Sequence, residues 1–250
     1  MIDPVNARLA DLFNWGNYKM GKKVLTFSIP AVFSCIGSTS VCREVCYANT
    51  GFFKMPNVAD KYQRNWDFTR TSDFVPVASK LLQKLPKNTL FRLHVAGDFY
   101  SAEYVRNWIE ILKVNPQLIC WAYTRSWRVS AIRTELVKLS KLPNVTLWFS
   151  VDKETGSPRS LPANIRTAYM MTADDDIPAL GADLYFRDGS ARHVVVKHIN
   201  GDIVCPHENG ITKKITCEKC KLCFRSEALP TFTTPGGFTT VDKRVSLQTV

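Results

Sequence analysis

Short apolar runs alternate with segments of helical periodicity along most of the chain. Runs that are rich in β-branched and aromatic residues, and that end at polar, Gly or Pro positions, predict strands. These predicted strands cover residues 23–31, 89–98, 117–123, 145–151 and 165–172. Their even spacing indicates a repeating unit in which a strand is followed by a helix.

Three amphipathic segments between these strands predict helices. The first begins behind Ser72 and stops at Pro86, the second begins behind Ser101 as its N-cap, and the third spans 129–139. Alternating strands and helices favour a parallel sheet covered by helices. With about six strands expected, we predict an α/β, TIM-barrel-like fold whose barrel is incomplete or distorted.

The composition changes near residue 202, beyond which Cys, Lys, Thr and Gly dominate. We therefore expect a barrel-like catalytic domain over 1–202, with a cysteine-containing insertion at 32–57, and a metal-stapled C-terminal segment over 203–250. The N-terminal residues lack the continuous apolar region of a secretory signal, and no apolar stretch reaches the ~18 residues of a membrane span. The sequence thus predicts a cytoplasmic protein with no membrane partner.

The charge balance points to the class of partner. Thirty-three Lys and Arg outnumber 22 Asp and Glu, which gives a net charge of +11 over 250 residues. Such an excess favours a polyanion, and DNA in particular, through long-range attraction rather than through the fold. The positive residues are dispersed along the chain, so an ordinary solvated surface is the alternative explanation.

Seven of the eight cysteines fall into two groups, and only Cys120 lies alone, within an apolar strand. Because a reducing cytosol keeps thiols free, metal ligation or redox chemistry is favoured over structural disulfides. The second group has the spacing C-x11-C-x2-C-x2-C and comprises Cys205, Cys217, Cys220 and Cys223. Four such thiolates predict a zinc site or, alternatively, a [4Fe–4S] cluster, with His207 as a substitute ligand.

The first group, Cys35, Cys42 and Cys46, has the spacing C-x6-C-x3-C and offers three ligands. Three thiolates can hold a cluster with one open iron, as in radical chemistry on S-adenosylmethionine, although the usual spacing there is C-x3-C-x2-C. This group is therefore a candidate second metal site. A disulfide or plain buried thiols are the structural alternatives.

Candidate chemistry also lies at the ends of the predicted strands. Alternation along FRLHVAGDF places Leu93, Val95 and Phe99 toward the helices, and His94 and Asp98 toward the barrel interior. Asp98 then stands at the carboxyl end of its strand, where barrel active sites are built. The structural alternatives are a helix-capping Asp and a hydrogen-bonded core His.

Two further strands bring side chains to the same end of the predicted barrel. In LWFSVD, Ser150 and Asp152 occupy interior positions, so a second carboxylate reaches the first, and two carboxylates can divide the roles of nucleophile and acid or base. On the strand between them, Trp121, Tyr123 and Arg125 share one face and offer stacking surfaces and a cation for a base and a phosphate. Core packing is the alternative for the aromatic residues, and a turn cap for Asp152.

Four motifs carry a resemblance to a known family. In order, CREVCYA, PNVADKYQRNW, FRLHVAGDFYS and WAYTRS resemble the phage and plasmid gene product 88 family over residues 24–155. This resemblance implies a phage or mobile-element protein of the host cytoplasm. A barrel followed by a cysteine metal site is also similar to tRNA-guanine transglycosylases and their phage DNA counterparts, which insert 7-deazaguanines. The thiol spacing departs from the C-x-C-x2-C plus His of those enzymes.

These resemblances lead to one functional hypothesis and two alternatives. The leading hypothesis is a phage DNA-modifying transglycosylase that exchanges guanine for a 7-deazaguanine, in which Asp98 or Asp152 attacks the anomeric carbon and the other assists the base. A flipped-out base would be held by a set of five side chains. These are His94, Trp121, Tyr123, Arg125 and Ser150. The alternatives are an iron–sulfur, radical S-adenosylmethionine-like enzyme and a non-catalytic DNA-binding protein.

Overall fold

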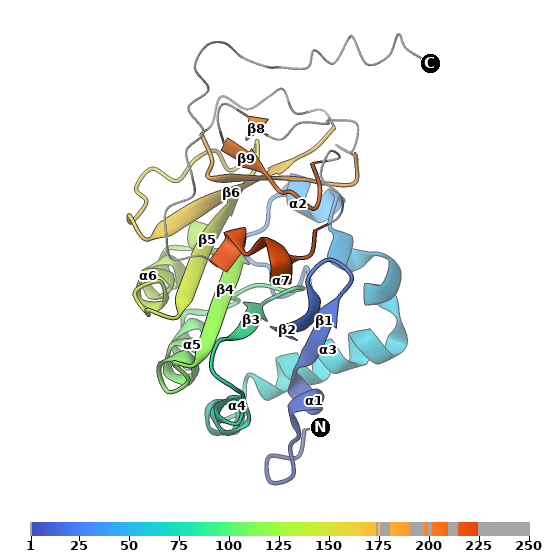
Figure 1. The fold of residues 1–250 in the computed structure, drawn as a ribbon, viewed down its shortest axis with the longest axis vertical. Helices are drawn as coiled ribbons and strands as arrows, with labels where there is room; N and C mark the ends of the chain where they lie inside the picture. The colour runs from blue at the N-terminus through green and yellow to red at the C-terminus, as the bar shows by residue number, and fades with distance from the viewer. Residues whose placement is uncertain are drawn as a thin grey trace.

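Nine strands form a single open sheet in the computed structural model, which describes residues 2–173, 175, 181–190, 198–199, 202–209 and 215–224. The spatial order is β1-β2-β3-β4-β5-β6-β7-β9-β8 (Figure 1). The strands are β1 (Asn14–Asn17), β2 (Gly21–Phe27), β3 (Thr89–Leu93), β4 (Leu118–Thr124), β5 (Val145–Val151), β6 (Ile165–Met171), β7 (Leu184–Arg187), β8 (His198–Ile199) and β9 (Asp202–Val204).

The sheet is parallel from β2 through β7 to β9, and neighbouring strands from β2 to β7 follow one another in the sequence. This order is that of a barrel, but the sheet does not close. Closure requires the first and last parallel strands to pair with each other. Here the free edge of β2 pairs antiparallel with β1, and that of β9 pairs antiparallel with β8. The α/β class is confirmed, and the described strands form an open sheet rather than a barrel.

Helices cover one face of this sheet, which we call the outer face (Figure 1). The α-helices of the described residues, on either face, are α1 (Leu9–Leu12), α2 (Ser40–Glu44), α3 (Pro56–Phe68), α4 (Phe74–Gln83), α5 (Ala102–Lys113), α6 (Ser130–Leu139) and α7 (Cys217–Cys220). Helix α5 begins where Ser101 Oγ accepts a hydrogen bond from Tyr104 N at 3.1 Å, as its sequence predicts. Its fully buried Trp108 contacts the rings of Phe27, Phe74 and Phe91 in the main core.

The opposite, inner face is covered by the C-terminal part of the described chain. Helix α7 contacts β2, and the short 3-10 helix η5 (Leu222–Phe224) contacts β4 and β5. The ring of Phe224 lies 4.7 Å from that of Trp121, and Trp148 Nε1 donates a hydrogen bond of 2.8 Å to the carbonyl of Cys223. No helix of the described residues is long and apolar enough to cross a membrane.

The predicted strand boundaries agree with the structure for β5 but not for β3. Strand β5 covers the predicted residues 145–151, whereas β3 ends at Leu93 and not at residue 98. His94 has a φ of 59°, which is left-handed backbone and ends the alternation of side chains. As a result His94 turns to the outer face, and its expected orientation toward the interior is wrong.

The expected boundary at residue 202 is not a boundary of the sheet. Strand β9 begins at Asp202 and pairs with β7, so the C-terminal segment starts as a strand of the main sheet. Residues 210–214 and 225–250 of the predicted segment lie outside the described residues.

Candidate functional site

The carboxyl ends of β3, β4 and β5 meet at one edge of the sheet, which we call the carboxyl edge. After β3 the chain turns at Gly97, whose φ is 84°, and a Cβ there would lie 2.4 Å from Ile29 Cγ1. Only glycine suits both the left-handed backbone and the close approach. The turn delivers Asp98 to the end of β4.

Asp98 is 5% exposed and each of its carboxylate oxygens accepts hydrogen bonds. Thr124 Oγ1 donates at 2.6 Å, and the backbone N–H groups of Phe99, Arg125 and Ser126 donate at 2.7, 2.8 and 3.3 Å. Burial raises the pKa of Asp98, and these hydrogen bonds oppose that shift. The carboxylate therefore ties the turn after β3 to the end of β4.

Asp152, after β5, is fully buried and forms an ion pair with Arg125. Arg125 Nη1 lies 2.5 Å from Asp152 Oδ2, which also accepts a hydrogen bond of 2.7 Å from Thr39 Oγ1. Oδ1 accepts from the backbone N–H groups of Glu154 and Thr155 at 3.0 and 2.9 Å. The two predicted carboxylates thus reach one edge, where Arg125 contacts both, through its backbone N–H and its guanidinium.

The loop between β2 and α3 crosses this edge, and we call it the thiol loop because it carries the first cysteine group. Arg128 Nη1 donates a hydrogen bond of 3.0 Å to the carbonyl of Gly37, and a Cβ on Gly37 would lie 2.2 Å from the carbonyl oxygen of Arg125. At the start of α2, Ser40 N donates to Glu154 Oε2 at 3.0 Å. The loop is therefore fixed onto the ends of β4 and β5.

Cys35, Cys42 and Cys46 are half-buried on this loop, beside the two aspartates. Burial and then the charge of Asp98 raise the pKa of Cys35 to about 12. Burial also raises the pKa of Cys42, whose thiol hydrogen-bonds with Arg125, and the positive charge of Arg125 opposes the shift. Cys42 also interacts electrostatically with Cys35 and Cys46, so the three thiols are neighbours.

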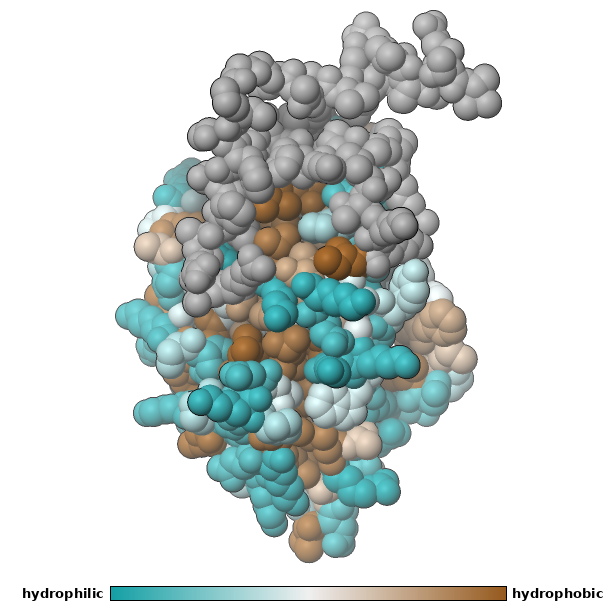
Figure 2. Space-filling model, in the orientation of Figure 1, coloured by the Kyte–Doolittle hydropathy of each residue, from teal (hydrophilic) through white to brown (hydrophobic). Residues whose placement is uncertain are grey.

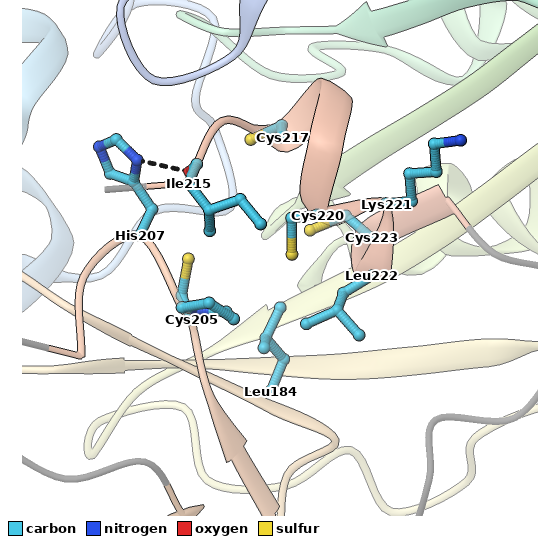
Figure 3. A pocket seen from close by; sticks show the side chains of 10 residues that line it. Leu184, Cys205, His207, Ile215, Cys217, Cys220, Lys221, Leu222 and Cys223 are labelled. Atoms are coloured by element: carbon cyan, nitrogen blue, oxygen red, sulfur yellow. Dashed lines mark hydrogen bonds between the residues drawn. The ribbon is translucent and has the colours of Figure 1, made fainter. Parts of the chain in front are cut away.

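The second cysteine group lines one small pocket on the inner face, which we call the four-thiol pocket (Figure 3). Its thiols belong to Cys205, Cys217, Cys220 and Cys223. Cys205 follows β9, while the other three lie on α7 and η5, so the thiols reach the same space from two directions (Figure 3). The cavity measures about 10 Å³, room for about one water molecule.

Backbone contacts fix both walls of the four-thiol pocket. Cys217 N donates to the carbonyl of Lys19 at 3.0 Å, and Cys205 N donates to that of Tyr185 at 2.8 Å. His207 Nδ1 hydrogen-bonds with the carbonyl of Ile215 at 2.9 Å, so this nitrogen is already engaged (Figure 3).

Positive side chains surround the four-thiol pocket. Burial disfavours the charge of Lys19, but Glu208 and the neighbouring thiols more than compensate and raise its pKa. Arg92 lies with its guanidinium 4.3 Å from the ring centre of Tyr123, and its buried Nη1 has no hydrogen-bond partner. The Tyr123 hydroxyl lies against the thiol of Cys223. Burial raises the pKa of Cys205, Cys217 and Cys223, and the nearby charges of Lys19 and Arg92 only partly oppose that shift.

Neither cysteine group converges on a single point. Among the described residues, no three His, Cys, Asp or Glu side chains are arranged so that they could hold one metal ion. The zinc site predicted from C-x11-C-x2-C-x2-C thus has its thiols lining a common pocket, without the geometry of a bound ion.

Structure and prediction differ on the expected base-binding set. The His94 ring is 3% exposed on the outer face, where Nε2 hydrogen-bonds with the Tyr104 hydroxyl at 2.9 Å and burial lowers its pKa to about 3. Trp121 and Tyr123 do lie on the inner face, but Phe224 covers Trp121, and Tyr123 stacks on Trp148 at 5.6 Å. These rings pack in the interior and present no free stacking surface.

The remaining predicted residues lie closer to expectation. Ser150 is half-exposed, and its carbonyl accepts a hydrogen bond of 2.9 Å from Trp127 Nε1. Cys120 is buried in the main core, as its apolar strand predicts.

Thr39 and Glu154 were not predicted. Thr39 carries a sequence signal as the N-cap of α2, whereas nothing in the sequence marks Glu154 as its anchor.

Comparison with known proteins assigns the chain to a family. The sequence profile described as Gene product 88 matches residues 6–226, which include both cysteine groups and both aspartates. The chain belongs to the gene product 88 family. Two similar relatives are the Gene 88 proteins of Mycobacterium phages L5 and D29, which are 29% and 28% identical over 221 and 222 residues. Each match covers 81% of this chain and 82% of the relative. No solved structure matches this gene product 88 protein.

Proposed function

We propose that this gene product 88 protein is an iron–sulfur enzyme whose catalytic cluster is held by Cys35, Cys42 and Cys46. The observation that carries the proposal is the position of the thiol loop. It follows the first parallel strand and brings three neighbouring thiols to the carboxyl edge, where open α/β sheets bind their ligands. Three thiolate ligands leave one iron of a [4Fe–4S] cluster open to a substrate or co-reactant.

The donor set supports a cluster over a single ion. Soft thiolates favour zinc, copper(I) and iron–sulfur clusters. A single ion draws its ligands to one point, whereas the inorganic core of a cluster keeps the ligating sulfurs further apart. The thiol loop offers three free, half-buried cysteines, a donor set that suits such a cluster.

Arg125, Asp98 and Asp152 are assigned here as positioning residues. Both carboxylates are buried and their oxygens are occupied, so attack on a sugar would first require these hydrogen bonds to break. Arg125 is held by Asp152 and directs its guanidinium at Cys42, where a positive charge stabilises a thiolate ligand. A cluster held by Cys35, Cys42 and Cys46 would supply one-electron reduction, from an external reductant, to a co-reactant such as S-adenosylmethionine at its open iron.

The four-thiol pocket is proposed to hold a second metal centre, either zinc or an auxiliary cluster. A metal bound by four thiolates is negatively charged, and Lys19 and the unpartnered Nη1 of Arg92 supply nearby positive charge. The Tyr123 hydroxyl against Cys223 is placed to donate a hydrogen bond to the ligating sulfur. The centre would join β9 to α7 and η5 and so fasten the cover of the inner face.

Anaerobic purification and reconstitution with iron and sulfide test the proposal. The wild-type protein should be brown, absorb at roughly 400 nm and contain iron and sulfide. Cys42→Ser should lose the iron of the thiol loop and all release of 5′-deoxyadenosine from S-adenosylmethionine with dithionite as reductant. Cys120→Ala, which removes a thiol from the core, is the matched control and should keep both signals.

The outcome that contradicts the proposal is a colourless protein that binds zinc alone under anaerobic conditions. Equal iron content in Cys42→Ser and wild type would also remove the thiol loop from the site. Cys220→Ser separates the two centres, since it should lower metal content without abolishing cleavage of S-adenosylmethionine.

The second candidate is the guanine transglycosylase, with DNA and a 7-deazaguanine as substrates and a zinc ion in the four-thiol pocket. One observation favours it: Asp98, after β3, and Asp152, after β5, both lie at the carboxyl edge, and both contact Arg125. Mass spectrometry of nucleosides from cells that express the protein tests this candidate. A modified deoxyguanosine that disappears with Asp98→Asn or Asp152→Asn would support it over the iron–sulfur enzyme.

A further inference from the structure

A broad cleft opens at the other end of the strands, and we call it the basic cleft. It has a volume of about 850 Å³ and lies at the amino ends of β2, β3 and β4, beside α7. Its charged lining consists of Lys22, Lys23, Lys87, Lys221 and Glu218. The seven residues of β4 separate it from the carboxyl edge by about 20 Å. The cleft is therefore distinct from the thiol loop, whereas it adjoins the four-thiol pocket, whose lining also includes Lys221.

The four lysines of the cleft carry uncompensated charge. All four are exposed, and no acidic side chain of the described residues forms an ion pair with any of them. Glu218, the one acid in the lining, is directed at the backbone: its Oε2 accepts a hydrogen bond of 3.2 Å from Lys23 N. Figure 2 shows hydrophilic residues gathered over α7 and the nearby ends of β1 and β2.

An aromatic ring completes the lining. Trp15, on β1, is 49% exposed although it is a large apolar side chain. The lining also includes Leu90, Ile119 and Phe224, so the cleft combines apolar side chains with lysines. Lysines along a groove with an exposed indole are the combination that binds single-stranded nucleic acid, in which phosphates contact the cations and bases stack on rings.

We infer that the basic cleft binds a single-stranded segment of nucleic acid, with phosphates on Lys22, Lys87 and Lys221 and a base stacked on Trp15. The volume lies at the upper end of the range of ligand pockets, which suits more than one nucleotide. Duplex DNA is too rigid to bring one base onto Trp15 without being opened. The inference does not depend on the chemistry of the carboxyl edge and extends the general attraction of a +11 chain to one defined surface.

The test compares two triple variants that lose the same net charge. Lys22→Gln, Lys87→Gln and Lys221→Gln alter the cleft, whereas Lys80→Gln, Lys113→Gln and Lys141→Gln alter exposed lysines that do not line it. Binding of labelled oligothymidylate of about 12 nucleotides is followed by fluorescence anisotropy over a salt series. The cleft triple should bind at least about tenfold more weakly and reduce the slope of log K against log salt by about 2, because each phosphate contact contributes about 0.7.

Trp15→Ala gives an independent readout, since it removes the ring and keeps the charge. Its affinity should fall by about fivefold or more, with an unchanged salt slope. Oligouridylate in place of oligothymidylate distinguishes RNA from DNA within the same chemistry. Equal losses in the two triples, undiminished binding in the cleft triple, or equal binding of polyglutamate or of duplex DNA would each overturn the inference. Circular dichroism of every variant separates loss of binding from loss of fold.

Discussion

The two faces of the sheet are covered in different ways. On the outer face, helices cover the strands with an apolar core in which Trp108 is fully buried. On the inner face, aromatic rings and arginines lie under a short segment that carries three of the four thiols of the pocket. The outer face therefore needs nothing beyond side-chain packing, whereas the stability of the inner face should depend on what the thiols hold.

The largest effect is expected from Trp108→Ala on the outer face. This change removes a ring that contacts four aromatic neighbours and leaves a cavity, which costs about 3–5 kcal/mol of unfolding free energy. Denaturant titration measures the loss, and the same loss should be found with and without a metal chelator. A loss that changes with the chelator would show that the two faces are not independent.

Removal of the metal proposed for the four-thiol pocket should have the next largest effect, on the inner face. At a metal concentration of about 100 Kd, binding stabilises the folded protein by about 2.7 kcal/mol. A chelator should therefore lower the melting temperature of the wild type, while in Cys220→Ser this shift should be smaller, because only the proposed centre of the thiol loop remains for the chelator to remove. Tryptophan fluorescence reports on Trp121 and Trp148 under the cover. An identical melting temperature for metal-free and metal-loaded wild type would contradict a structural metal.

His94 should make the outer face sensitive to acid. Its pKa is about 3 in the folded protein against an ordinary value of 6.5, so protonation favours the unfolded chain. The contribution is complete above pH 6.5 and is lost as the pH falls toward 3, which amounts to about 2 kcal/mol by pH 5. Asparagine tolerates left-handed backbone, so His94→Asn should be less stable at pH 8 but lose less stability on acidification. If the unfolding free energies of wild type and His94→Asn fell equally as the pH is lowered, the acid sensitivity could not be assigned to His94.

The smallest effect is expected at the start of α5. Ser101→Ala removes the side-chain acceptor of Tyr104 N and should cost about 1 kcal/mol. Because α5 lies on the outer face, this loss should be the same in the metal-free and metal-loaded protein. Chemical denaturation of the single variant in both states provides the measurement, and unequal losses would place α5 under the influence of the pocket.

The sequence predicts the outer face better than the inner face. Apolar periodicity locates β5 and the Ser101 cap because these depend on local spacing and on burial against helices. Periodicity fails at His94, because its left-handed backbone places the side chain on the face opposite to the one that alternation predicts. It also fails for the hairpin partner β1, because four residues with a Gly carry almost no pattern.

The candidate site is predicted in part for the same reason. Strand ends place Asp98 and Asp152 at one edge, as the sequence predicts. Their engagement depends on Thr39, Thr124 and Arg125, and Thr39 lies 113 residues from Asp152 along the chain. Such long-range pairing leaves no periodic trace, so whether a carboxylate is free or bound is decided by the tertiary structure.

The cover of the inner face also sets an order of events during synthesis. Domains fold progressively as the chain leaves the ribosome, and the strands that carry Trp121 and Trp148 emerge well before η5. Until Cys223 and Phe224 have been synthesised, both indole rings are exposed to water and to other proteins. A nascent chain of this family should therefore expose an aromatic surface that can bind other proteins. This exposure lasts while the more than seventy residues from Trp148 to Cys223 are translated. Metal supply would then be a limit on soluble yield and not only on activity.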